Sequence, residues 1–338
     1  MTVYITRLNG MMTISTPQYV QRKTAEVAYQ LGCREMGIYY YNANAEKLDH
    51  LHARLDGIIA GLSAEDIVIC QFPTWNGLRF ERALIEHIKA YHCHVVIFVH
   101  DFEALMEESW QDKLRGTVEL YNQAEVLIVP SYTMKGFLLE NGVRLDMKFV
   151  IQEIWDYPTD IHFTYGPKLK KEIHFAGSPG RFIFPNQWDY DILLKVYADE
   201  PCTGKNIQRM GWMNPSGLLL ELAKGGFGLV WYRDEYMHQY MRYNNNTKLS
   251  TCLAAGIPVI VPNGISNQYI IEGNHLGLVV DSLEEAVEKV QNMTEQEYQE
   301  YIRHVGKFAV LLRKGYFTKK LLTEAVHLVF RDDRALRI

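Results

Sequence analysis

One stretch of the sequence already contains a complete helix–strand unit: NNNTKLSTCLAAGIPVIV, residues 244–261. Its polar start is typical of a loop, residues 247–255 are predicted to form a helix, and the apolar run over 258–261 has the length of a buried strand. Helices that alternate with short buried strands build parallel sheets through right-handed crossovers. The stretch therefore predicts an α/β fold.

The same alternation continues outward from this unit in both directions. Short, β-branched apolar runs predict strands at residues 3–5, 37–40, 67–70, 95–99, 126–129 and 149–151, and again at 173–175, 193–197, 227–231, 258–261 and 278–280. Helices are predicted from Ser15 or Thr16 onward with Pro17 at the first position, and at 216–224, 247–255, 283–292 and 317–330. Capping boxes are predicted at Ser282 with Glu285 and at Thr294 with Glu297.

The pattern breaks once, at residues 156–170, where Pro158, Gly166 and Pro167 stand among polar residues as in a hinge. A chain of 338 residues is also long enough for two domains of about 150 residues each. We therefore predict two α/β domains with doubly wound parallel sheets, residues 1–158 and 159–315. The last helix, within residues 316–338, is expected to cross back onto the first domain.

Composition excludes several classes of protein. Hydrophobic residues make up 48% and charged residues 22% of the chain, which is ordinary for a globular protein and unlike a disordered or coiled-coil chain. Lys and Arg total 35 against 40 for Asp and Glu, and the resulting charge of −5 is unlike the basic footprint of a nucleic-acid binder. No nucleic-acid partner is expected.

The chain is expected to work in the cytoplasm. Its five cysteines are widely spaced and contain no C-x-x-C pair, which is typical of free thiols in a reducing compartment. The first residues lack the pattern of a signal peptide, and no apolar run is long enough to cross a bilayer. Arg313, Lys314, Lys319 and Lys320 flank an apolar helical stretch that could touch anionic lipid or simply form a solvated face.

Two loops carry the groups that a diphosphate needs. Lys248 lies in the first turn of the helix predicted at 247–255, where the helix dipole and free amides favour an anion. The second loop, HFAGSPGRF over 174–182, follows a predicted strand and contains Gly177 and Arg181, whose fork suits phosphate oxygens. A solvated lysine and an ordinary glycine-rich turn are the alternatives.

Several segments resemble known glycosyltransferases. The residues LAAGIPVI (253–260), NGISNQ (263–268) and GNHLGLV (273–279) resemble the donor half of glycosyltransferases with two Rossmann-like domains, the GT-B type. The segments RLDGI (54–58), QFPTWN (71–76), KEIHF (171–175), GGFGLVW (225–231) and LRKGYFT (312–318) resemble the third glycosyltransferase of bacterial serine-rich-repeat adhesin glycosylation. This resemblance covers more than 250 residues in order along the chain.

The resemblance implies a fold and an activity. The fold would be GT-B, with two Rossmann-like parallel-sheet domains facing a crevice. The activity would be transfer of glucose from UDP-glucose to N-acetylglucosamine O-linked to Ser or Thr of the adhesin, by a homo-oligomer, a dimer or a tetramer. The alternatives are UDP-N-acetylglucosamine or UDP-galactose as donor, a UDP-N-acetylglucosamine 2-epimerase, and a non-catalytic sugar-binding subunit of a transferase complex.

The resemblance also assigns donor residues. Arg181 and Lys248 match the family's diphosphate contacts, and Trp212 lies where such enzymes hold the base, so that it either stacks on uracil or packs in the core. Many retaining members have a glutamate of a pair where this chain has Asn267 and Gln268, which favours an inverting displacement. The donor set expected is Gly177, Arg181, Trp212, Asn246, Thr247, Lys248, Asn267 and Gln268.

Acceptor residues are expected where strands of the first domain end. This set is Asn9, Thr16, Trp75, Asn76 and His100, with Trp75 offering either a flat face to a sugar or a side chain for the core. Asp101 is the candidate general base, since an inverting transfer needs a group that takes the proton of the acceptor hydroxyl. A capping role is the alternative for Asp101. The catalytic residues expected are Asp101, Arg181 and Lys248.

No metal or other cofactor is expected. Asp189, Tyr190 and Asp191 form a D-x-D pattern, but a GT-B site neutralises the diphosphate with side-chain cations and a helix terminus. The sequence contains no H-E-x-x-H, G-x-S-x-G or Walker motif, so metalloprotease, α/β-hydrolase and P-loop functions have no support.

Overall fold

The computed structural model describes residues 1–12, 15–164 and 166–331, and its contacts divide the chain into two compact units. The first unit comprises Met1–Gln152 and Phe317–Ile338, and the second comprises Glu153–Tyr316. The predicted boundary after residue 158 lies six residues further on, because Trp155 is already held by the second unit through a hydrogen bond from its Nε1 to the carbonyl of Asn245 (3.0 Å). Residues 332–338 of the predicted C-terminal segment lie outside the described residues.

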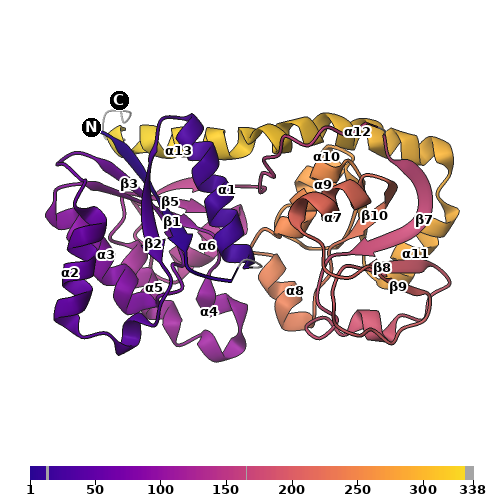
Figure 1. The fold of residues 1–338 in the computed structure, drawn as a ribbon, viewed down its shortest axis with the longest axis horizontal. Helices are drawn as coiled ribbons and strands as arrows, with labels where there is room; N and C mark the ends of the chain where they lie inside the picture. The colour runs from indigo at the N-terminus through magenta and orange to yellow at the C-terminus, as the bar shows by residue number, and fades with distance from the viewer. Residues whose placement is uncertain (13–14, 165, 332–338) are drawn as a thin grey trace. The chain divides into compact units, whose positions relative to one another are not determined.

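The first unit is built on a parallel six-stranded sheet with the order β2-β1-β3-β4-β5-β6. Figure 1 shows β1, β2, β3 and β5 of this sheet. Its strands are β1 (Val3–Asn9), β2 (Arg34–Tyr39), β3 (Ile67–Phe72), β4 (His94–Val99), β5 (Val126–Val129) and β6 (Lys148–Ile151). Every residue of β3 and β5 is buried, as expected for strands covered on both faces. All six predicted strands are present.

Helices connect these strands, and one more comes from the end of the chain. They are α1 (Thr16–Gln30), α2 (Leu48–Ile59), α3 (Leu78–Ala90), α4 (Glu103–Met106), α5 (Lys113–Tyr121), α6 (Tyr132–Glu140) and α13 (Tyr316–Phe330), with short 3₁₀ turns at Ala43–Ala45 and Glu108–Trp110. The Nζ of Lys148, at the start of β6, donates to the carbonyls of Leu328 (2.8 Å) and Arg331 (2.6 Å). Helix α13 is thus fixed to the first unit, as predicted.

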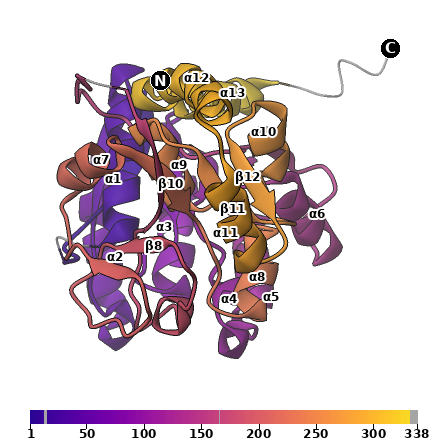
Figure 2. The same cartoon turned by 90° about the vertical axis from the view of Figure 1, so that its right-hand side faces the viewer.

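The second unit repeats this design with the strand order β12-β11-β10-β7-β8-β9, again all parallel. Figure 2 shows β10, β11 and β12 of this sheet side by side. The strands are β7 (Lys168–Phe175), β8 (Leu193–Val196), β9 (Ile207–Arg209), β10 (Gly225–Leu229), β11 (Val259–Pro262) and β12 (Gly277–Val280). Strand β9 was not predicted, because this short edge strand has two exposed residues out of three and no apolar run.

The helices of the second unit are α7 (Pro215–Leu222), α8 (Glu235–Met241), α9 (Thr247–Ala255), α10 (Gln268–Gly273), α11 (Leu283–Asn292) and α12 (Glu295–Lys314), with a 3₁₀ turn at Phe184–Gln187. Caps were predicted for two of these helices, and the short helices α8 and α10 were not predicted. The capping box of Thr294 and Glu297 is complete. The one predicted at Ser282 is only half formed: Ser282 accepts from the Glu285 N–H, but the Glu285 carboxylate accepts from the Asp281 N–H instead.

Within the described ranges, no helix combines the length and the apolar character that a membrane-spanning segment needs.

Candidate active site

The second unit has a topological switch point between β7 and β10. Strand β7 lies between β8 and β10, so the chain leaves it in one direction and returns on its other side. Ligands of open parallel sheets bind beyond the carboxyl ends of the strands at such a point. The loop after β7 starts at this edge, and α9 also begins there, because it returns the chain to the start of β11.

These two segments bring Arg181 and Lys248 together. The Nζ of Lys248 lies 5.0 Å from the ring centroid of the buried Phe182, the residue that follows Arg181. Burial first, and the positive charge of Arg181 second, lower the pKa of Lys248 to about 8. Arg181 itself is exposed. Two neighbouring cations without a carboxylate partner among the described residues are costly in the empty protein and suited to an anion with two charges.

The asparagine-rich loop before α9 is fixed by the fold. Asn246 is the N-cap, and its Oδ1 accepts from the backbone N–H of Lys248 (2.9 Å). Asn245 is buried, and its Oδ1 accepts from Ser266 Oγ (2.9 Å). Thr247 is the first helical residue. The loop therefore presents the positive end of α9 and its lysine in one fixed geometry.

The other predicted donor residues follow strands of the same sheet, and they differ in exposure and in hydrogen bonding. Trp212 is 52% exposed, on the segment between β9 and α7, so it does not pack in the core. Gly177 lies over the Phe175 ring, which a Cβ would overlap. Asn267 is buried, and its Nδ2 has no hydrogen-bond partner in the part of the chain described. Gln268 is committed to the loop, since its Oε1 accepts from the Gly264 N–H (2.7 Å).

The D-x-D segment differs from a metal site. Asp189 forms an ion pair with Lys205, and both side chains are more than half exposed. Asp191 is exposed as well. Among the residues that the structure describes, no group of three or more His, Cys, Asp or Glu side chains is placed to hold a metal ion.

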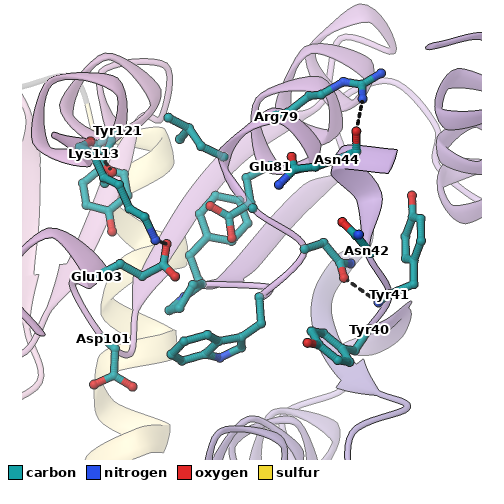
Figure 3. A pocket seen from close by; sticks show the side chains of 17 residues that line it. Tyr40, Tyr41, Asn42, Asn44, Arg79, Glu81, Asp101, Glu103, Lys113 and Tyr121 are labelled. Carbon is teal, nitrogen blue, oxygen red and sulfur yellow. Dashed lines mark hydrogen bonds and ion pairs between the residues drawn. The ribbon is translucent and has the colours of Figure 1, made fainter. Parts of the chain in front are cut away.

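The first unit contains a cavity of about 440 Å³ at the carboxyl ends of β2, β3 and β4 (Figure 3). Residues from three loops and from α3, α4 and α5 line it: Tyr40, Tyr41, Asn42, Asn44, Phe72, Pro73, Trp75, Asn76, Gly77, Leu78, Arg79, Glu81, Asp101, Glu103, Lys113, Thr117 and Tyr121. Of the predicted acceptor-side residues, the cavity brings together Trp75, Asn76 and Asp101. The volume is that of a site for a small molecule.

The loop after β3 is shaped by two of these residues. Asn76 is buried and ties the loop to the end of β2, because its Oδ1 accepts from the Tyr41 N–H (2.8 Å) and its Nδ2 donates to the Tyr39 carbonyl (3.0 Å). Trp75 has φ +62°, a left-handed conformation that is uncommon for a tryptophan and typical of functional loops. Its Nε1 is buried with no hydrogen-bond partner among the described residues.

Acidic side chains dominate the cavity. Glu81, Asp101 and Glu103 line it, and Lys113 Nζ lies 3.5 Å from Glu103 Oε2 (Figure 3). The other cation of the lining is Arg79. Its guanidinium donates to the backbone carbonyls of Ala43, Asn44 and Glu46 and is thus held by the 3₁₀ turn. A lining with three carboxyl groups and two cations that are both engaged suits an uncharged ligand with many hydroxyl donors.

Three expected acceptor residues are not part of this lining. Asn9 ends β1, and its Nδ2 donates to the Arg7 carbonyl (3.1 Å). Thr16 is an exposed residue in the first turn of α1. His100 is buried with its ring 4.5 Å from that of Phe98, and burial lowers its pKa to about 3, so its imidazole is neutral. Their predicted roles stay predictions.

The structure adds Glu81, Glu103, Lys113 and Tyr121, which were not predicted. One signal for Glu81 was present in the sequence: it lies three, four and seven residues before Leu84, Ile85 and Ile88, on the buried stripe of α3. A carboxyl group on an apolar stripe is unusual. The other three come from elements whose convergence on the cavity no local pattern contains.

Two Rossmann-like units with parallel six-stranded sheets define the class: the fold is that of GT-B glycosyltransferases, as predicted. HepE of Anabaena, solved in complex with UDP, has this fold with a TM-score of 0.64 over 97% of this chain and 100% of HepE, at 10% identity.

The chain belongs to the glucosyltransferase 3-like family, whose N-terminal domain matches residues 2–154 and whose C-terminal domain matches residues 173–325. It is 44% identical to Glucosyltransferase 3 of Streptococcus parasanguinis, over 96% of this chain and 98% of that protein. It is 40% identical to Glucosyltransferase 3 of Streptococcus gordonii, with the same coverage. The enzyme class predicted from the sequence, a glycosyltransferase, is confirmed.

Proposed function

We propose that this enzyme transfers glucose from UDP-glucose to N-acetylglucosamine O-linked to serine or threonine of a serine-rich-repeat adhesin. The observation that carries the proposal is the pair formed by Arg181 and Lys248 beside the N-terminus of α9, at the switch point of the second unit. Relatives named glucosyltransferase support the donor sugar. UDP-galactose and UDP-N-acetylglucosamine remain the alternative donors to test.

The leaving group is stabilised by the cation pair. As the bond between glucose C1 and the β-phosphate oxygen breaks, negative charge grows on UDP, and fixed cations stabilise that state more than the ground state. The helix terminus adds the backbone amides of its first turn. Asn267 offers a buried amide donor, and Trp212 an exposed indole for the uracil ring.

The acceptor sugar occupies the cavity of the first unit, where Asp101 takes the proton of its reacting hydroxyl as the oxygen attacks C1 of glucose. This single displacement inverts the anomeric centre. It agrees with Asn267 and Gln268 standing where retaining relatives have a glutamate of a pair, and with the engagement of the Gln268 amide in its own loop. No metal enters this mechanism, because Arg181 and Lys248 supply the positive charge.

We also place the enzyme in the cytoplasm as a homo-oligomer. None of the five cysteines is in a disulfide, which suits a reducing compartment. Size measurement in solution distinguishes a monomer from a dimer or a tetramer.

The test of the proposed function is product mass. The protein is incubated separately with UDP-glucose, UDP-galactose and UDP-N-acetylglucosamine, each with an adhesin fragment that carries O-linked N-acetylglucosamine. We expect one hexose to be added from UDP-glucose. Conversion of a UDP-sugar without acceptor would instead identify an epimerase, and absence of turnover with retained sugar binding would identify a non-catalytic subunit.

The donor site is tested by calorimetric titration of UDP. Replacing Lys248 or Arg181 with alanine should weaken UDP binding by about 10-fold to 150-fold, since each loses one charge-assisted contact. Lys205→Ala is the control, because it removes an exposed lysine of the same unit that is paired with Asp189. Wild-type affinity in both alanine variants would contradict the donor site.

A further inference from the structure

The proposed mechanism leaves two carboxyl groups of the cavity unused, and of these Glu103 is paired with Lys113 whereas Glu81 has no ion-pair partner among the described residues. Glu81 is only 6% exposed, and its Oε1 accepts two hydrogen bonds, from the Thr74 N–H (2.5 Å) and from Thr74 Oγ1 (3.0 Å). Its Oε2 has no hydrogen-bond partner within the described part of the chain, and the residue lines the cavity (Figure 3). Oε1 is thus held in place by Thr74, and Oε2 is an unpartnered acceptor that a ligand in the cavity can reach.

The contact with Thr74 does not require a charged side chain. A glutamine carbonyl would accept the same two hydrogen bonds without the cost of burying a carboxylate. That cost is visible here, because burial raises the pKa of Glu81 to about 7 and no described lysine or arginine forms an ion pair with it. Retaining an ionisable group at this position therefore points to recognition of a ligand.

The ligand that fits is a neutral sugar that donates hydrogen bonds. Glu81, Asp101 and Glu103 share the cavity with two cations that are already engaged, Lys113 by Glu103 and Arg79 by backbone carbonyls, so the lining disfavours a phosphate group. A carboxylate oxygen that faces a cavity accepts from O–H or N–H donors, and a sugar ring offers several.

Asp101 and Glu81 differ in burial, and this difference separates their roles. The reacting hydroxyl must meet a donor molecule that arrives from outside the cavity, so the group that takes its proton must lie where the cavity is accessible. Asp101 is partly exposed, whereas Glu81 is buried. A group at the depth of Glu81 contacts the sugar away from the reacting oxygen.

We propose that Glu81 is the acceptor-recognition residue, whose Oε2 accepts a hydrogen bond from a hydroxyl or amide N–H of the acceptor sugar. This inference rests on the proposed function, since it deepens the acceptor site and leaves proton transfer to Asp101.

Acceptor binding should consequently depend on pH. The groups that face Glu81 from neighbouring elements are Cys70 on β3, Asp101 after β4, Glu103 on α4, and Lys113 and Tyr121 on α5. Of these, Glu103 raises and Lys113 lowers the pKa of Glu81. When Glu81 gains its proton, Oε2 stops acting as a charged acceptor, so acceptor affinity falls as the pH drops through about 7.

The experiment uses Glu81→Gln, which keeps an oxygen for Thr74 and changes the atom that faces the cavity. Steady-state transfer from UDP-glucose to the modified adhesin fragment is measured from pH 6 to 8. We expect the acceptor KM to rise about tenfold or more at pH 8, with kcat and UDP affinity nearly unchanged and with the rise of KM at low pH abolished. Glu86→Gln is the matched control, an exposed glutamate on the same helix.

Two results would overturn the inference. A collapse of kcat at unchanged acceptor KM would make Glu81 the proton acceptor, and a lowered melting temperature with unchanged KM and pH profile would make it purely structural. Saturation-transfer NMR with N-acetylglucosamine gives a second readout that needs no turnover. Loss of that signal in Glu81→Gln alone would support sugar recognition even if transfer to the adhesin fragment fails, so the two proposals fail separately.

Discussion

The affinity for UDP should fall as the pH rises through 8. In the empty protein, burial and Arg181 hold the pKa of Lys248 at about 8 instead of its ordinary 10.5. A bound diphosphate favours the charged ammonium and raises this pKa, so the complex holds more protons than the free protein. Binding is therefore strongest where Lys248 is already protonated and weakens where a proton must be taken up.

The size of the effect follows from that pKa. About nine-tenths of the Lys248 side chains are protonated at pH 7 and about one-tenth at pH 9, so UDP affinity should drop about tenfold across this range. At pH 8, binding should take up about half a proton per UDP. Calorimetric titration in two buffers of different ionisation enthalpy measures both quantities.

Lys248→Arg is the control, because a guanidinium stays charged over this range and its UDP affinity should be flat from pH 7 to 9. Equal wild-type affinities at pH 7 and 9, with no proton uptake at pH 8, would refute the placement of Lys248 against the diphosphate.

Three further predictions concern the acceptor base, metals and packing. Asp101→Asn should lower kcat by about 10² to 10⁴ while UDP affinity stays unchanged, and a melting temperature that falls together with activity would point to a capping role instead. Activity should survive a strong chelator and the double change Asp189→Asn with Asp191→Asn, whereas loss on chelation that manganese restores would contradict a metal-free mechanism. In Gly228→Ala the new Cβ would overlap Cys252 Sγ, so we expect the free energy of unfolding in urea to fall by about 1–3 kcal/mol. UDP binding should weaken as well, because Cys252 lies on α9, the helix that carries Lys248. Unchanged stability would count against this packing.

The fold could be predicted from the sequence wherever burial dictates composition. Strands β3 and β5 are covered on both faces, and for that reason β5 is entirely apolar and β3 is apolar except for Gln71. Strand β9 lies at a sheet edge, so its residues meet no such demand. The half-formed cap at Ser282 depends on how the preceding loop directs the Asp281 N–H, which the spacing of Ser282 and Glu285 does not contain.

The candidate site residues Lys248 and Glu81 differ in how visible they are in the sequence. Lys248 stands out because a lysine in the first turn of a helix opposes the helix dipole unless an anion is bound. Glu81 resembles any charged residue of an amphipathic helix until its position on the buried stripe is noticed. Its contact with Thr74 then depends on the turn of the loop after β3, where Trp75 takes a left-handed conformation.

Helix α13 follows the second unit along the chain, yet it belongs to the first unit. Its side chains Leu321, Leu322, Ala325 and Val329 are buried, and Lys148 binds the carbonyls at its end. The first unit therefore stays incomplete on the ribosome until α13 has emerged, while the contiguous second unit can close before that, the reverse of the usual order. Chains cut short before residue 316 would leave the first unit with an uncovered apolar face, so incomplete products should be recognised by quality control before they can act.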